Sequence, residues 1–414
     1  MRKIGGISLL IGWLCLSSSG CSVNEVVVAE ETELVVADAP VDEAMLLDIG
    51  IIDFDGSLDP NNDPLKTGVY EDIRNAETKY LAYHLKTTLQ GTGHWGAVRV
   101  IPSRDAFTDI VISGVIERSD GEFVELRIAV SDAAGRSWFE RNYTAQTGLT
   151  SYSERRDRRR DPYQKVFNDI ANDLQQYVAA LPPRQLQQTR QISELQFFAD
   201  MSPLAFGDYL GTGEDGLVAI RRLPAENDPA VLRMRQIRER DRLVVDTLNE
   251  HYANFYYGIA IPYRGWRKNA REELINYREQ KRSARLQALV GVVVLAGSLA
   301  IDTENSSSRT SRNVKRGLQY MGIEEGFNRV IGAYRQNREA GIHLEAIAEL
   351  SKSFGIEAAP MIVNVEGQQR RLTGTAEAQY ESWRKLLKEI YQAETGFTQA
   401  IEVAEPVRAA EDTS

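Results

Sequence analysis

Three successive β-strand patterns separated by tight-turn signals constrain the fold more than any other feature of this chain. Apolar residues, many of them branched, alternate with polar ones over 109–118, 122–132 and 137–146. The dipeptides Asp120-Gly121 and Ala134-Gly135 lie between these runs. Such dipeptides favour short turns between antiparallel strands. We therefore expect the three runs to form an antiparallel meander.

Further elements flank the meander. The run 46–54 is rich in branched residues and predicts a buried strand, and 97–101 predicts a short one. Apolar and aromatic residues at helical spacing predict a helix over 70–90, and Asp161-Pro162 marks the start of a second helix that ends near Ala180. The predicted class is therefore α+β, with a small mixed sheet and two helices in a domain spanning 44–182.

This order of elements resembles a small periplasmic domain found in several envelope proteins. The residues that carry the resemblance are Ile49–Phe54, Asp109–Ile116 and Glu122–Asp132, and the similar region covers about a third of the chain. The family includes the curli-secretion lipoprotein, the N-terminal domain of the TolB protein and the lipoprotein activator of penicillin-binding proteins. The domain binds proteins or self-assembles in that family and is not catalytic, so the resemblance implies a binding module.

The N-terminus carries a targeting signal. Arg2 and Lys3 precede an apolar run of 13 residues, Ile4–Leu16, which is too short to span a bilayer. Small residues, 17–20, then lead to Cys21. This pattern resembles a bacterial lipoprotein signal, although a serine replaces the usual leucine three places before the cysteine. The resemblance implies a leader over 1–20, lipidation of Cys21 and, because a serine follows Cys21, anchoring to the outer membrane on its periplasmic face. The alternative is an ordinary secretory leader with an incidental cysteine.

The residues after Cys21 predict a tether. Seven acidic and no basic residues lie between residues 22 and 43. Like charges extend a chain and disfavour its collapse. We expect residues 21–43 to be an acidic tether, with short strands at 26–28 and 34–36 as the alternative. The other cysteine, Cys15, lies in the leader, so the mature chain has no disulfide available.

A mainly helical region is expected over 184–355. Gln185–Met201 predicts a helix, and a second helix starts at Asp228 and runs to about Tyr257. Between them, 211–216 fits a G-x-G-x-x-G string. The pair Glu214-Asp215 would repel phosphate, so we interpret this stretch as a turn-rich connector rather than a nucleotide loop.

For two apolar segments of this region, the sequence allows both a buried and an exposed position. The aromatic residues of 252–266 suit either a hydrophobic core or a surface that stacks on sugars or partners, with Tyr257, Tyr263 and Trp266 as candidates. Leu286–Ile301 is the most apolar stretch of the mature chain and follows a basic segment. It is a buried helix, a membrane-contacting segment, a self-associating segment or a strand.

The densest basic cluster precedes the helix that begins near 161. Its members are Arg155, Arg156, Arg158, Arg159 and Arg160. They suit contact with anionic lipid, lipopolysaccharide phosphate or an acidic protein, or a solvated loop.

At the other end of the chain, residues 356–397 predict a short hairpin and a helix, and 398–414 a disordered tail.

No catalytic motif is recognised around the four histidines, and no G-x-S-x-G elbow occurs. We expect no catalytic residue, cofactor or metal site. With 49 basic and 59 acidic residues, the net charge of −10 also disfavours nucleic acid as a partner. The expected function is a non-catalytic, lipid-anchored envelope protein that binds or helps assemble periplasmic or outer-membrane partners, with homo-oligomers allowed. The alternatives are an oligomeric secretion component, a peptidoglycan-associated factor and an unrecognised hydrolase.

Overall fold

The computed structural model describes residues 31–62, 69–148, 150–153, 160–225, 227–299, 349, 361–365 and 368–395. For residues 277, 280–299, 364, 365 and 368 the description covers the backbone alone. The predictions on the leader, on Cys21, on the arginines of 155–159 and on the tail 398–414 lie outside the described residues.

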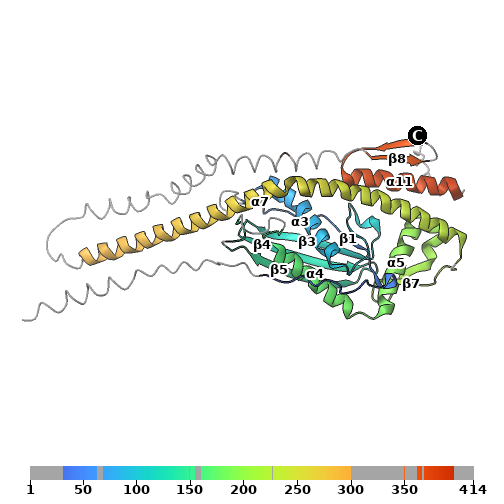
Figure 1. Ribbon diagram of the computed structural model, residues 1–414, viewed down its shortest axis with the longest axis horizontal. Helices are drawn as coiled ribbons and strands as arrows, with labels where there is room; N and C mark the ends of the chain where they lie inside the picture. The colour runs from blue at the N-terminus through green and yellow to red at the C-terminus, as the bar shows by residue number, and fades with distance from the viewer. Residues whose placement is uncertain are drawn as a thin grey trace, which may run out of the picture.

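The first part of the chain forms the predicted α+β domain around one five-stranded sheet (Figure 1). The elements follow in the order β1 (Ile49–Ile51), α3 (Glu71–Thr92), β2 (Val98–Val100), β3 (Ile110–Ser119), β4 (Phe123–Asp132), β5 (Ser137–Gln146) and α4 (Gln164–Ala179). The sheet order is β2-β1-β3-β4-β5. Strand β1 pairs in parallel with β2 and β3, whereas β3, β4 and β5 form the antiparallel meander. The predicted fold class and the meander are therefore confirmed.

The two faces of the sheet differ because side chains alternate along each strand. In β4, Val124, Leu126, Ile128 and Val130 are buried in the core beneath α3 and α4. On the other face, Arg127 bridges Glu117 and Glu140 across three strands, and all three side chains are more than 40% exposed. The described structure thus covers one face of the meander with helices and leaves a polar, ion-paired surface on the other.

The described part of the predicted tether lies against this domain. Asn168 of α4 donates to the carbonyl of Thr32 (2.6 Å). Asn172 donates to the carbonyl of Glu33 (2.8 Å) and accepts from the amide of Val35 (2.9 Å). The segment from residue 31 to 37 therefore runs along α4, and its backbone is held by side chains of that helix. It forms no strand, so the alternative of a strand at 34–36 is wrong.

Over its described residues, the predicted helical region contains helices and one short hairpin. Helix α5 (Pro183–Met201) and the single turn α6 (Pro203–Phe206) precede strands β6 (Leu210–Thr212) and β7 (Val218–Ile220). The glycine-rich stretch is the turn of this hairpin, and Gly216 has the positive φ of +79° that such a turn favours. The prediction of a turn-rich connector is confirmed, with a small sheet added to it.

Helix α7 (Pro229–Leu299) is far longer than predicted. It does not end near Tyr257 but continues through Pro262, so the aromatic residues and most of the apolar run 286–301 belong to the same helix. Proline lacks the N–H that would bond to the carbonyl four residues earlier, which is why a helix through it is not expected. Figure 1 shows α7 lying along the domain and then extending beyond the sheet.

The C-terminal unit is the predicted hairpin and helix, and it packs on the first half of α7. Strands β8 (Met361–Val365) and β9 (Gln368–Leu372) form a hairpin, followed by α11 (Ala376–Thr395). Asp241 of α7 accepts from Trp383 Nε1 (3.1 Å) and from the Tyr380 hydroxyl (3.2 Å), both of α11. Among the described residues, no helix combines the length and the apolar character that crossing a bilayer requires.

Substitutions at two turn glycines test how closely α7 packs on the β3–β4 turn. Gly121 and Gly135 both have φ near +85°, at +84° and +86°. A Cβ at Gly121 would lie 2.2 Å from the Arg267 carbonyl oxygen of α7, whereas a Cβ at Gly135 meets nothing within 4 Å. We expect Gly135→Ala to lower the free energy of unfolding by ~1–2 kcal/mol through backbone strain. Gly121→Ala should cost ~1–3 kcal/mol more through the clash. Urea unfolding measures both, and equal losses would contradict the close packing of the turn on α7.

Candidate functional site

The described end of the basic loop lies where the N-terminal segment meets α7. Arg160 Nη1 pairs with Glu31 Oε2 at 3.0 Å, and both side chains are about half exposed. Arg264 of α7 donates to the carbonyl of Arg160 (3.4 Å) and to the carbonyl of Ser151 (3.4 Å). This end of the domain therefore gathers the first described residue of the chain, the end of the arginine cluster and α7.

The three aromatic residues proposed as a partner surface do not share one environment. Tyr257 is 67% exposed, whereas Tyr263 and Trp266 are fully buried. Tyr263 and Trp266 are therefore wrong as surface residues. Tyr263 packs against Tyr80 of α3 with ring centroids 4.7 Å apart, and the Tyr263 and Trp266 rings stack with centroids 6.0 Å apart. The interpretation of this cluster as hydrophobic core holds for both of them.

A buried ion pair lies beside these rings. Asp161, just before α4, accepts hydrogen bonds from Nη1 (2.9 Å) and Nη2 (2.8 Å) of Arg267, and both side chains are almost completely buried. The guanidinium also lies 4.2 Å from the Tyr263 ring and 4.9 Å from the Tyr163 ring. Burial opposes ionisation of Asp161, but the Arg267 guanidinium outweighs it and holds the pKa of the carboxyl well below its usual range. The carboxylate and the guanidinium therefore both stay charged at neutral pH.

A neutral histidine extends this network to α3. His84 is fully enclosed, and its Nε2 lies 2.9 Å from Gln164 Oε1, so this nitrogen donates to the amide oxygen. Its Nδ1 lies 2.7 Å from the Tyr256 hydroxyl, which then donates to the ring. Burial lowers the pKa of His84 below its usual value. Together with the ion pair, this histidine connects α3, α4 and α7.

A second buried carboxyl contributes to the same junction. Glu77 of α3 accepts from the Tyr263 hydroxyl at 2.7 Å and lies 3.3 Å from Arg74 Nε. Burial raises the pKa of Glu77, although Arg74 and the hydrogen bonds from Ser119 and Tyr263 oppose that rise. These groups bond to one another, and Arg74 also lines the polar cleft described below. We therefore interpret the cluster as the fixture that holds α7 on the domain rather than as a catalytic site.

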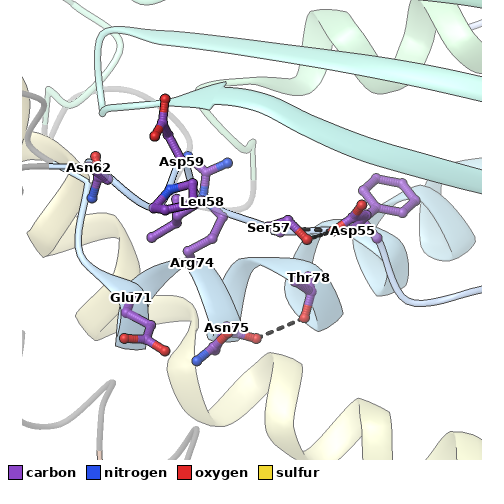
Figure 2. A pocket seen from close by; sticks show the side chains of 12 residues that line it. Asp55, Ser57, Leu58, Asp59, Asn62, Glu71, Arg74, Asn75 and Thr78 are labelled. Carbon is purple, nitrogen blue, oxygen red and sulfur yellow. Dashed lines mark hydrogen bonds between the residues drawn. The ribbon is translucent and has the colours of Figure 1, made fainter.

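A polar cleft opens beyond the carboxyl end of β1 (Figure 2). Its volume is about 610 Å³. The loop from Asp55 to Asn62 forms one wall, and the first turns of α3, with Glu71 and Arg74, form the other. Clefts at the carboxyl ends of parallel strands are common ligand sites in α/β folds. The position of this cleft makes it the strongest cavity candidate in the described part of the chain.

The polar groups of the cleft serve the loop itself. Asp55 accepts from the Ser57 amide (2.8 Å) and from the Ser57 hydroxyl (2.6 Å), and these two bonds lower the pKa of Asp55. A carboxylate with a lowered pKa is a weak general base, so this pair lacks the property that an activated serine needs. Asp59 closes a similar turn on the Asn61 amide (2.7 Å). The arrangement stabilises a loop and can bind a polar group, but it assembles no acid–base pair among the described lining residues.

The residues that organise this end of the molecule were missed in the sequence. Asp161 was visible as a helix start, but its partner lies 106 positions later, within a helix that was expected to end at Tyr257. No local spacing connects such groups. The signal that was present is the arginine within the aromatic cluster, because an arginine among aromatic residues of a core needs a buried acid.

No family model, no curated protein and no solved structure matches this chain.

Removing Arg267 tests the buried pair. Arg267→Met would leave Asp161 buried without its partner, and such losses cost ~3–5 kcal/mol. Arg127→Met, at the exposed ion pair of the open sheet face, should cost less than ~1 kcal/mol. Asp161→Asn in the Arg267→Met background should recover part of the loss. Urea unfolding measures all three, and equal effects of Arg267→Met and Arg127→Met would contradict the role assigned to the pair.

The burial of His84 in its neutral form should make the stability of the protein depend on pH. Its folded pKa is lowered, so below about pH 6.5 the unfolded chain takes up a proton that the folded chain does not. The contribution of His84 is therefore fully present above pH 6.5 and is lost as the pH falls toward the lowered pKa. We expect His84→Asn to reduce the drop in the free energy of unfolding between pH 7.5 and 5.5. An unchanged pH dependence in this variant would show that His84 is not buried in its neutral form.

Proposed function

We propose that this chain is a non-catalytic, lipid-anchored protein of the bacterial cell envelope that binds or helps assemble envelope partners. The observation that carries the proposal is the N-terminal pattern of Arg2-Lys3, the short apolar run and the small residues before Cys21. This pattern resembles a lipoprotein signal. Two or three acyl chains at one cysteine would anchor the chain stably, whereas a single chain would not.

The position of the N-terminal segment supports close anchoring. Docking on α4 begins by Thr32, and Glu31 pairs with Arg160. Glu31 lies ten positions after Cys21, so even a fully extended connection reaches only about 35 Å. The part of the tether that is not docked on the domain is therefore shorter than the segment 21–43 that was predicted from its acidic residues. In this proposal, the end of the domain that carries Arg160 faces the membrane.

The α+β domain supplies the surface for binding. Its order of elements resembles the periplasmic domain of the curli-secretion and penicillin-binding-protein-activator lipoproteins, in which the domain binds proteins or self-assembles. The polar face of the meander, with Glu117, Arg127 and Glu140, is left open by the described helices. We propose this face as the contact for envelope proteins. The peptidoglycan alternative loses its main support, because Tyr263 and Trp266 are buried.

The two cysteines give a matched test of the anchor. We expect wild type and Cys15→Ser to incorporate labelled fatty acid and to fractionate with the outer membrane. Cys21→Ser should lose the label, because Cys21 is the proposed acceptor of the acyl chains. Labelling with a fatty-acid analogue, followed by cell fractionation, measures this. A labelled, membrane-bound Cys21→Ser variant, or an unlabelled and soluble wild type, would contradict the proposal.

A further inference from the structure

The far end of α7 carries an apolar segment beyond the domain. The last buried apolar side chain described on α7 is Ala270, and the last described ion pair to the sheet joins Arg278 to Glu122 in the β3–β4 turn. The helix continues for 21 residues to Leu299, which is about 32 Å at 1.5 Å per residue. Figure 1 shows this part of α7 extending past the sheet.

The sequence of this extension has two parts. Four basic residues and one acidic residue lie within 278–285, and no charged residue occurs from Leu286 to Leu299. An apolar run of 14 residues is shorter than the ~20 residues that span a bilayer. A helix with basic residues beside an apolar segment matches the composition of helices that bind the interface of anionic membranes.

The N-terminal segment meets α7 at the end from which this extension leaves. Glu31 pairs with Arg160, and Arg264 of α7 donates to the Arg160 carbonyl. From this junction the connection to Cys21 reaches about 35 Å. The apolar segment of α7 starts at Leu286, 22 positions after Arg264, which is about 33 Å along the helix. A lipid on Cys21 can therefore reach as far from this end of the domain as the start of the apolar segment.

We propose that the end of α7, residues 278–299, docks on the phospholipid surface that holds the Cys21 acyl chains, as a second, non-covalent contact. The basic residues meet anionic headgroups, and the apolar turns enter the interface without spanning the bilayer. The shared surface rests on the proposed lipid anchor, but the affinity of the helix for phospholipid does not. This second contact fixes the orientation of the domain, which a tether alone leaves free.

Flotation with vesicles tests the helix without the lipid anchor. The mature chain carrying Cys21→Ser is mixed with vesicles of phosphatidylethanolamine and phosphatidylglycerol, or of phosphatidylcholine alone. We expect binding to the anionic vesicles that weakens as salt is raised, because headgroup attraction is screened. Val293→Glu should weaken this binding at least about tenfold, because a charge in the apolar segment is costly to insert. Leu243→Glu, at an exposed position of the same helix, should leave it unchanged. Circular dichroism and thermal unfolding check that each variant folds.

The outcomes separate this inference from the proposed function. Equal binding of Val293→Glu and the parent chain, or no binding by either, would overturn the inference while leaving lipidation of Cys21 untouched. Binding that depends on Val293 in a protein whose Cys21 is not lipidated in cells would support the inference and refute the anchor. If the parent chain stays off vesicles and forms oligomers that Val293→Glu disrupts, a second copy of α7 is the partner and the inference fails.

Discussion

The buried pair of Asp161 and Arg267 is the interaction on which the arrangement of this molecule depends. It joins the start of α4 to the middle of α7, and Tyr80 of α3 donates to the same carboxylate at 3.1 Å. Burying two charges is costly unless each meets its partner in good geometry. The pair therefore forms in this register of α7 on the domain, and a shift of the helix along its axis would break it. The neutral His84 and the protonation-prone Glu77 add further constraints at the same junction. The helix is thereby fixed in register on the domain.

Fixing α7 at this point determines what lies at each of its ends. The first half carries the C-terminal unit, which is held through Asp241. The second half leaves the domain beside the β3–β4 turn, next to Arg160 and Glu31. Helix α7 thus carries the C-terminal unit at one end and the apolar segment at the other. In the proposed setting, the first faces the periplasm and the second faces the membrane.

The elements that depend on local pattern were predictable, and those that depend on distant partners were not. The meander followed from two glycine turns and alternating side chains, and both glycines have the positive φ that their turns require. The C-terminal hairpin and helix were also found from local signals. Helix α7 was predicted to end near Tyr257, whereas it continues through Pro262 and packs its aromatic residues into the core that it shares with α3. For Tyr263 and Trp266 both a core and a surface position stayed open, because composition cannot tell which side of a helix meets a core.

The central claim is that α7 is one rigid arm that carries its apolar end outward from the domain. The most direct measurement is the distance between spin labels at Tyr257→Cys and Gln287→Cys, on either side of Arg267, by pulsed dipolar spectroscopy. The thirty residues between them predict a narrow distribution centred near about 45 Å. A broad distribution, or a distance far below this value, would show that the helix breaks near Pro262 and would contradict the account.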